Sequence, residues 1–232
     1  MNSAIIVAAG KGKRMGANTG KLFLELAGRP VIAHTWQQFE QADCIGEIVL
    51  VVRDGLQSTF AELGAKYGFK KPFRVAAGGA ERQDSVWNGL QVISPQATLV
   101  AIHDGARPMV TPELIAATLA AARESGAAVA AQRVTDTIKE SEDGLTITRH
   151  LERARLWAVQ TPQTFQVDLI RRAITAAREQ GLSLTDDTAA CQLIGQPVRL
   201  VLCAIPNPKV TVPADLPYVE RLLQEQGGKM RG

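Results

Sequence analysis

Glycines and cations alternate in one stretch near the amino terminus, and this combination suits the binding of phosphates. The stretch contains Gly10, Gly12, Gly16 and Gly20 together with Lys11, Lys13, Arg14 and Lys21. Glycine allows the backbone to approach a ligand closely, while exposed amides and cationic side chains supply donors and positive charge for an anion. We therefore predict a phosphate-binding loop, with an ordinary basic surface turn as the alternative.

The glycine spacing departs from the two best-known nucleotide-binding loops. The first three glycines read G-x-G-x-x-x-G, whereas a dinucleotide fingerprint needs G-x-G-x-x-G. A Walker A loop needs four residues between its glycines and then lysine followed by serine or threonine. Here three residues separate Gly16 from Gly20, and Leu22 follows Lys21. The spacing therefore disfavours both readings, including a dinucleotide-dependent oxidoreductase.

Other charged side chains lie in or near loops further along the chain. They are Arg82, Asp104, Arg107, Arg153 and Lys209. A single cation is usually a solvated surface charge, but several at strand ends favour a site. Phosphoryl and nucleotidyl transfer depend mainly on positioning and on stabilising charge at phosphorus oxygens with cations, amides and a metal. Asp104 could contact a nucleotide sugar or assist Mg²⁺, which binds through few carboxylates together with substrate phosphates.

Other catalytic chemistries find little support in the sequence. There is no Ser-His-Asp order, no H-E-x-x-H and no cysteine-histidine signature. Of the three histidines, His34 falls in a predicted helix and His150 near a predicted hairpin. His103 adjoins Asp104, so it either orients that loop or is a satisfied core histidine. The three cysteines are widely spaced, which favours core thiols over disulfides or a zinc site.

Alternating strands and helices would position these residues. The predicted buried strands are apolar runs at residues 5–9, 46–53, 73–77, 98–102 and 127–131. The segments between them carry apolar residues at helical spacing, and Thr111, Pro112 and Glu113 have the pattern of a helix start. This is typical of a mostly parallel α/β sheet, whose ligands bind outside the carboxyl ends of the strands. We expect three loops, which begin at residues 10, 78 and 103, to converge on one cleft.

The pattern changes at about residue 133. Residues 137–139 and 145–148 flank a Glu-Asp-Gly turn, which predicts a two-stranded hairpin. A lone hairpin is marginal in water, so we expect this arm, at about 133–156, to pack on a partner subunit. Beyond it we predict helices after residue 165, from Thr185 and over about 215–226, with a strand at 198–204. The whole chain, residues 1–232, is interpreted as a single domain with an arm.

Composition limits the class of protein. The 232 residues are 46% hydrophobic and 21% charged, which is typical of a soluble globular chain with a substantial core. Lysine and arginine exceed aspartate and glutamate by only 26 to 23, so general binding to nucleic acid or membrane is not indicated. We see no signal peptide and no apolar run of about 20 residues, and we expect a cytoplasmic protein.

Seven motifs together resemble those of the 2-C-methyl-D-erythritol 4-phosphate cytidylyltransferase family. In order they are AAGKGKRMG (8–16) with Lys21, GGAERQDSV (78–86), HDGARP (103–108), Asp136-Thr137, Leu156-Trp157 with Thr161-Pro162-Gln163, Thr185-Asp186 and NPKVT (207–211). The resemblance covers nearly the whole chain. It implies a Rossmann-like nucleotidyltransferase sheet with helices on both faces. It also implies a reaction of CTP with methylerythritol phosphate in the presence of Mg²⁺, in a homodimer that exchanges its hairpin arms.

The resemblance also implies roles for individual residues. Those implied to be catalytic are Arg14, Lys21, Arg153 and Lys209. Those implied to bind the nucleotide, largely through backbone, are Ala8, Ala9, Gly10, Gly79, Ala80, Ser85 and Asp104. Those implied to surround the methylerythritol phosphate are Asp104, Arg107, Thr137, Arg153, Thr161 and Lys209. Because the arm is exchanged in that family, Arg153 would serve the site of the neighbouring subunit.

Four positions depart from the family pattern. Gly20 and Leu22 flank Lys21 where proline and glutamine are usual, Ala80 stands where an acidic residue is common, and Gly105 stands where alanine is common. Two other functions stay open at this stage: a polyol-phosphate cytidylyltransferase, for example one that uses ribitol 5-phosphate, and a non-catalytic nucleotide-binding regulator. Thr137, Arg153 and Thr161 favour methylerythritol phosphate over other polyols. The presence of Lys21 and Lys209 favours an enzyme over a regulator.

Overall fold

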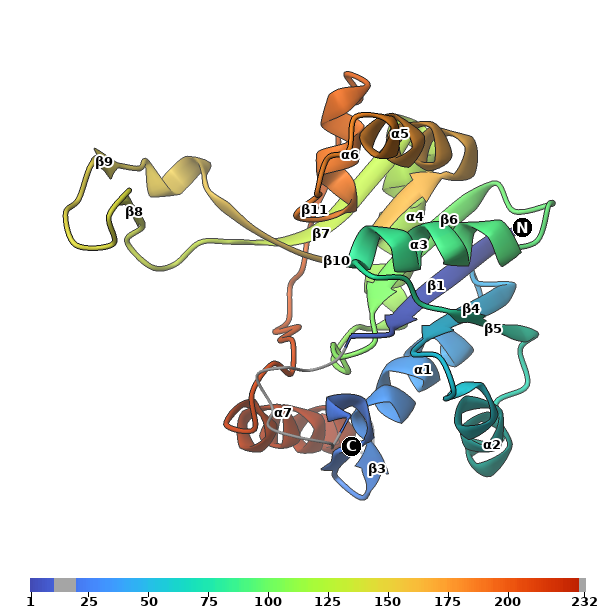
Figure 1. Ribbon diagram of the computed structural model, residues 1–232. Helices are drawn as coiled ribbons and strands as arrows, with labels where there is room; N and C mark the ends of the chain where they lie inside the picture. Colours follow the sequence, from blue (N-terminus) through green and yellow to red (C-terminus); the bar gives the residue numbers. More distant parts are fainter. Residues whose placement is uncertain (11–19, 230–232) are drawn as a thin grey trace.

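A seven-stranded sheet forms the centre of the structure (Figure 1). The computed structural model describes residues 1–10 and 20–229, with side chains up to residue 226. Across the sheet the strands are β11 (Arg199–Leu202), β7 (Ala127–Arg133), β10 (Trp157–Gln166), β6 (Leu99–Asp104), β1 (Asn2–Ala8), β4 (Glu47–Val52) and β5 (Phe73–Ala77). Strands β6, β1, β4 and β5 pair in parallel, as do β7 and β11, whereas β10 is antiparallel to both neighbours. The predicted α/β class with a mostly parallel sheet is confirmed.

Helices cover both faces of this sheet and create two hydrophobic cores. One core contains side chains of α1 (Val31–Gln41), α2 (Gln57–Tyr67), α4 (Pro112–Ser125) and α7 (Asp215–Lys229). The other contains side chains of α3 (Arg82–Val92), α5 (Val167–Glu179) and α6 (Asp187–Leu193). Strand β4 shows why its sequence is continuously apolar: Leu50 enters the first core and its neighbours Val49 and Val51 enter the second.

Local sequence signals place the ends of the helices near the site. Thr111 caps α4 by accepting a hydrogen bond from the amide of Leu114, and Pro112 occupies the first helical position, as predicted. At α3, the side chains of Glu81 and Asp84 form a reciprocal capping box. Helix α6 begins after Asp186, whose carboxylate accepts from the amide of Ala189. These caps fix where the loops after β5 and β6 and the loop before α6 can run.

Strand β10 is the main element that the sequence pattern does not predict. We expected residues 161–165 to lead into a helix, but they form the second half of a ten-residue strand in the middle of the sheet. Proline is rare in a central strand because it cannot donate to the ladder. The structure accommodates Pro162 with a cis Thr161–Pro162 bond and a shift of register between Val159 and Gln163.

The chain between β7 and β10 projects from the sheet as an arm (Figure 1). Its hairpin is present, but β8 (Lys139–Glu140) pairs with β9 (Arg149–His150), so the predicted strands at 137–139 and 145–148 are misplaced. The reason is Asp143, whose carboxylate accepts from the amides of Leu145 and Thr146 and keeps the following residues in the turn. A short 3-10 helix, η3 (Arg153–Arg155), completes the arm.

Small elements connect the first loop to the carboxyl-terminal part of the chain. They are the 3-10 helix η2 (Lys21–Phe23) and the short strands β2 (Glu25–Leu26) and β3 (Arg29–Pro30). Glu220 of α7 accepts a hydrogen bond from the amide of Ala27, so the last helix lies beside this segment (Figure 1). Within the described ranges, no helix combines the length and the apolar character needed to cross a membrane.

Candidate active site

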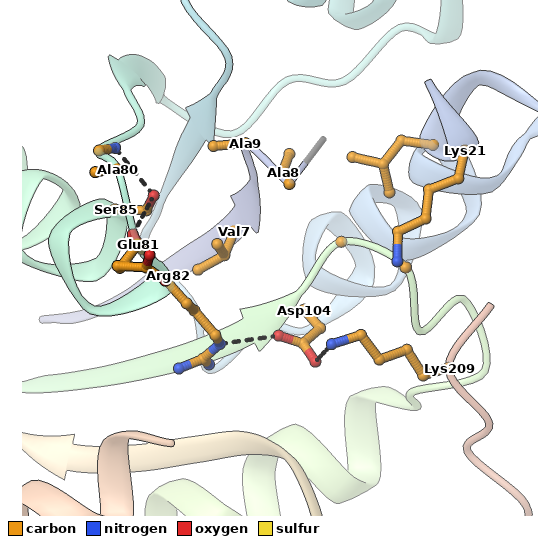
Figure 2. Close-up of a pocket in the computed structure, with 15 residues that line it drawn as sticks. Val7, Ala8, Ala9, Lys21, Ala80, Glu81, Arg82, Ser85, Asp104 and Lys209 are labelled. Carbon is orange, nitrogen blue, oxygen red and sulfur yellow. Dashed lines mark hydrogen bonds and ion pairs between the residues drawn. The ribbon is translucent and has the colours of Figure 1, made fainter. Parts of the chain in front are cut away.

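A cavity of about 410 Å³ lies at the carboxyl ends of β1 and β6. The three predicted loops line it: the end of β1 with Gly10, the turn from Gly79 to Arg82, and the segment from Asp104 to Ala106. Lys21 and Lys209 complete the lining from two further segments (Figure 2). The convergence of three loops on one cleft, which the alternation of strands and helices predicted, is therefore confirmed.

Small residues form the wall on the side of β1 and α3. The members of the predicted nucleotide-binding set that line the cavity are Ala8, Ala9, Gly10, Gly79, Ala80, Ser85 and Asp104. Ser85 fixes the turn before α3, because its hydroxyl accepts from the amide of Gly79 at 3.1 Å and donates to the carbonyl of Glu81 at 3.2 Å. At Gly78 a Cβ atom would overlap the Cβ atom of Ala9. The two loops can therefore meet only with glycine at that position.

Lys21 belongs to η2 and lines the cavity. Its Nζ donates to the carbonyl of Val210 at 3.1 Å, which joins the first loop to the segment that carries Lys209. Figure 2 shows Lys21 and Arg82 on opposite sides of the cavity, with Asp104 between them. Positive charge therefore flanks the cavity from two directions.

Asp104 is the centre of the electrostatic arrangement. Its carboxylate lies 2.7 Å from Lys209 Nζ, 3.3 Å from Arg82 Nε and 3.6 Å from Arg107 Nε. Burial by itself would raise the pKa of Asp104, but the neighbouring charges of Arg82 and Lys209 outweigh it and hold the pKa well below its usual range. The carboxylate is therefore ionised at neutral pH and aligns three cations that come from different segments.

Arg82 is held between two carboxylates. Its Nη1 lies 2.8 Å from Asp187 Oδ2, while its Nε faces Asp104. Burial would lower the pKa of Arg82, but the charges of Asp187 and Asp104 raise it above its ordinary value. The side chain of Asp187 is almost fully buried at the start of α6. This pair fixes the guanidinium at the edge of the cavity.

A second, smaller cavity of about 250 Å³ adjoins the first. Arg82, Asp104 and Lys209 line both cavities, and Arg107 and Thr161 line only the second. The side chain of Arg107 is fixed by donation from Nη1 to the carbonyl of Asn207 at 2.8 Å. Two hollows thus share a wall made of one carboxylate and two cations.

Some predicted residues lie apart from this cluster. Thr137 and Arg153 are exposed on the arm and line neither cavity, and Arg153 Nη1 donates to the carbonyl of Thr135 at 2.9 Å. Arg14 lies outside the described residues. Whether Arg153 reaches a site in a neighbouring subunit stays a prediction.

Two structural contributors to the site are not predicted from the sequence. Arg82 is one of several cations with no role assigned by its motif, and Asp187 falls in the helix predicted from Thr185. The signal for Arg82 was its place in the motif after β5. Nothing in the local sequence indicates that Asp187 is buried against Arg82, because that contact joins α3 to α6 across more than 100 residues.

Fold and site together define a nucleotide-binding transferase of the nucleotidyltransferase class. The sheet is parallel at the site, small residues line one wall, and cations converge where phosphates would lie. The model of the family IspD: 2-C-methyl-D-erythritol 4-phosphate cytidylyltransferase matches residues 2–225. The chain therefore belongs to the 2-C-methyl-D-erythritol 4-phosphate cytidylyltransferase family.

Individual relatives agree with the family match. The 2-C-methyl-D-erythritol 4-phosphate cytidylyltransferase of Alkaliphilus oremlandii is 44% identical over 226 residues, which cover 96% of this chain and 94% of that protein. The enzyme of the same name from Geobacillus kaustophilus is 44% identical, with coverage of 95% and 96%.

Solved structures are also similar. The structure of 4-diphosphocytidyl-2C-methyl-D-erythritolsynthase from Anaerococcus prevotii matches with a TM-score of 0.86 and 29% identity, and the match covers 96% of this chain and 97% of that one. For 2-C-methyl-D-erythritol 4-phosphate cytidylyltransferase from Thermus thermophilus, the TM-score is 0.78 at 34% identity, and coverage is 97% and 100%.

Proposed function

We propose that this protein converts CTP and 2-C-methyl-D-erythritol 4-phosphate to 4-diphosphocytidyl-2-C-methyl-D-erythritol and pyrophosphate, a step of the non-mevalonate isoprenoid pathway. An oxygen of the acceptor phosphate attacks the α-phosphorus of CTP, and the bond from this phosphorus to the bridging oxygen of the β-phosphate breaks. The observation that carries the proposal is the pair of adjoining hollows that share Asp104, Arg82 and Lys209. Two phosphate-bearing substrates can meet at such a wall.

The charges of the site suit the residue roles in this proposal. Lys21, with Arg14, would stabilise negative charge on the triphosphate as pyrophosphate leaves. Backbone groups at Ala8 to Gly10 and at Gly79 would hold the nucleotide. Lys209 and Arg107 would bind and orient the acceptor phosphate, because both line the smaller cavity and both are aligned by Asp104. The protein would then act mainly by positioning and by electrostatic stabilisation.

We also propose that the reaction uses Mg²⁺, which enters the site bound to CTP. Among the described residues no group of three or more His, Cys, Asp or Glu could hold a metal, and the carboxylate of Asp104 already faces three cations. Such a site fits an Mg²⁺ ion held chiefly by substrate phosphates, since this ion commonly takes only one or two carboxylates from the protein. Because Asp104 is shared among three cations, it would contribute at most one oxygen, and the bound ion would neutralise charge on the triphosphate.

We also propose a homodimer in which each arm completes the neighbouring site. Leu145 is 92% exposed and Ile147 is 54% exposed at the tip of the arm. Apolar side chains grouped on a projecting hairpin support burial against a partner. Thr137 and Arg153 lie on the same arm, so a partner subunit is the route by which they could contact an acceptor.

We also propose that the enzyme is located in the cytoplasm. CTP and a sugar-alcohol phosphate are soluble metabolites. The three cysteines are all free thiols, and free thiols suit a reducing compartment.

The proposed function is tested by pyrophosphate release from CTP with different acceptors. Reactions contain Mg²⁺ and methylerythritol phosphate, ribitol 5-phosphate or no acceptor, and a parallel set contains excess EDTA. We expect release with methylerythritol phosphate alone and its loss with EDTA. Release with ribitol 5-phosphate in place of methylerythritol phosphate would keep the chemistry and change the substrate. No release in any reaction by folded protein would favour the non-catalytic regulator.

A further inference from the structure

His103 is a fully buried residue directly before Asp104 in β6. Both nitrogens of its ring have a partner. Nε2 lies 3.1 Å from the carbonyl oxygen of Arg107, and Nδ1 lies 2.9 Å from the hydroxyl of Thr161. The ring of Phe39, whose centroid is 5.1 Å away, covers it from the side of α1. The imidazole is thus enclosed between the loop after β6, strand β10 and the core.

The partners decide which nitrogen carries the proton. A carbonyl oxygen only accepts, so Nε2 must carry the hydrogen and donate it to Arg107. Burial lowers the pKa of His103 to about 3, so the ring is neutral near pH 7 and Nδ1 has a free lone pair. Nδ1 then accepts from the hydroxyl of Thr161. That hydroxyl oxygen also accepts from the backbone amide of Asp104 at 3.1 Å.

These hydrogen bonds form a chain that runs from the amide of Asp104 through the hydroxyl of Thr161 and the ring of His103 to the carbonyl of Arg107. One end fixes the amide of Asp104, and the other fixes the backbone of Arg107. The carbonyl of Thr161 extends the chain, because it accepts from Nδ2 of Asn207 at 2.9 Å, two residues before Lys209. The backbone positions of Asp104 and Arg107, which line the smaller cavity, therefore depend on one buried imidazole, and the segment that carries Lys209 contacts the same strand through Asn207.

We propose that His103 is a positioning residue of the transfer reaction, which acts as the neutral Nε2–H tautomer through Thr161 and Arg107 and does not touch a substrate. The inference rests on the proposed cytidylyltransferase function. It also gives Thr161 a different role from the one implied by the resemblance. Its hydroxyl hydrogen is used by His103 and its side chain is buried, so Thr161 supports Asp104 and does not donate to the acceptor.

Three substitutions separate the contacts of the ring. His103→Phe keeps the ring and removes both nitrogens, His103→Asn keeps an acceptor close to the position of Nδ1, and Thr161→Val removes the hydroxyl. We expect His103→Phe and Thr161→Val each to lower kcat by about 10–100-fold, because small displacements of reacting groups cost rate. The KM for CTP should change much less than kcat, since residues 8–10 and 79–85 form most of the wall of the larger cavity and only Asp104 of that wall depends on the ring. His103→Asn should recover part of kcat.

The double variant distinguishes positioning from general damage. Because both side chains act through one chain of hydrogen bonds, His103→Phe combined with Thr161→Val should be little slower than either single variant, whereas independent effects would multiply. His34→Phe is the matched control: His34 also contacts a backbone carbonyl, that of Leu26, but lines neither cavity, so full activity is expected. Circular dichroism and thermal melts establish that each variant is folded.

The tautomer has a readout that does not require activity. Nitrogen-15 spectra of the histidine side chains in the wild-type protein should show Nε2 of His103 protonated and Nδ1 unprotonated. A protonated Nδ1, or folded His103→Phe with wild-type kcat, would overturn the inference. Failure of the proposed function looks different, because the wild-type protein itself would then release no pyrophosphate with methylerythritol phosphate. That result would remove the role in transfer together with the function.

Discussion

Among single residues, the carboxylate of Asp104 does most to organise the candidate site. It holds Lys209, Arg82 and Arg107 within 3.6 Å, although these side chains come from three separate segments. Cations that are aligned before a substrate arrives need no reorganisation as charge develops on phosphorus oxygens. The buried carboxylate of Asp104 therefore keeps the cations in position for the phosphates, although the site binds anions.

Replacing Asp104 tests this arrangement through stability. Asp104→Asn removes the charge that three cations share, and we expect the free energy of unfolding to fall by about 1–3 kcal/mol. Because the pKa of Asp104 is lower in the folded protein than in the unfolded chain, this contribution is present above about pH 4 and disappears as the pH falls further. Urea denaturation at pH 7 and pH 3 measures the difference.

A surface ion pair gives the matched control for that measurement. Glu124 faces Arg199 at 2.5 Å, but the two side chains are 68% and 55% exposed. Glu124→Gln should therefore cost less than about 1 kcal/mol. An equal loss for Glu124→Gln and Asp104→Asn at pH 7 would contradict the central role of Asp104.

Lys21 can be tested through turnover. Lys21→Ala should lower kcat by about 10²–10³-fold, because it removes a cation that stabilises the leaving triphosphate oxygens. The melting temperature should change little, since the side chain is only half-buried. Steady-state pyrophosphate release measures the effect, with exposed Lys70→Ala as the control. Rates like those of the wild type would refute the catalytic role of Lys21.

The sequence predicted the charged residues of the site better than the contacts between them. Lys21, Asp104 and Lys209 could be identified because each follows a strand or a glycine-rich loop. The contacts from Arg82 to Asp187 and from His103 to Thr161 could not be predicted. Each joins segments far apart in the chain, so its geometry depends on how α6 and β10 pack in the finished fold.

Among the elements, the parallel strands were predictable and the antiparallel strand was not. Strands β1, β4 and β6 are apolar runs because helices bury both faces of the sheet there, whereas β5 is a shorter and partly exposed run at the sheet edge. Strand β10 contains Thr161, Pro162 and Gln163, which are unusual in a central strand. Thr161 and Gln163 also line the smaller cavity, so they serve the site as well as the sheet, and this explains their departure from the apolar pattern.

The close approach of the loops that follow β1 and β5 can be tested at Gly78. A Cβ atom at Gly78 would overlap Ala9, so Gly78→Ala should separate the two loops and raise the KM for CTP by about tenfold or more. Gly89→Ala is the control: its Cβ would lie 2.9 Å from Ile5 and Val51 in the core, away from the cavity. This variant should lose stability and keep the KM for CTP. The same increase in KM for both variants would show that the effect is not local.

For the whole molecule, the arm decides whether one chain contains a complete site. Arg153→Ala and Lys21→Ala subunits should each be nearly inactive alone. After equal mixing, half of the dimers would be mixed, and each of these would contain one intact site, so activity should recover to about a quarter of wild type. Native mass spectrometry establishes subunit exchange. Absence of recovery after verified exchange would argue against a shared site.

Direct observation of the reaction by phosphorus-31 NMR tests the central claim, that the acceptor phosphate attacks the α-phosphorus of CTP. The protein is mixed with CTP, Mg²⁺ and methylerythritol phosphate, and every phosphorus signal is followed with time. We predict that one pyrophosphate and one diphosphate diester between cytidine and methylerythritol form for each CTP consumed. Formation of CDP with inorganic phosphate, or of CMP without the diester, would contradict the account.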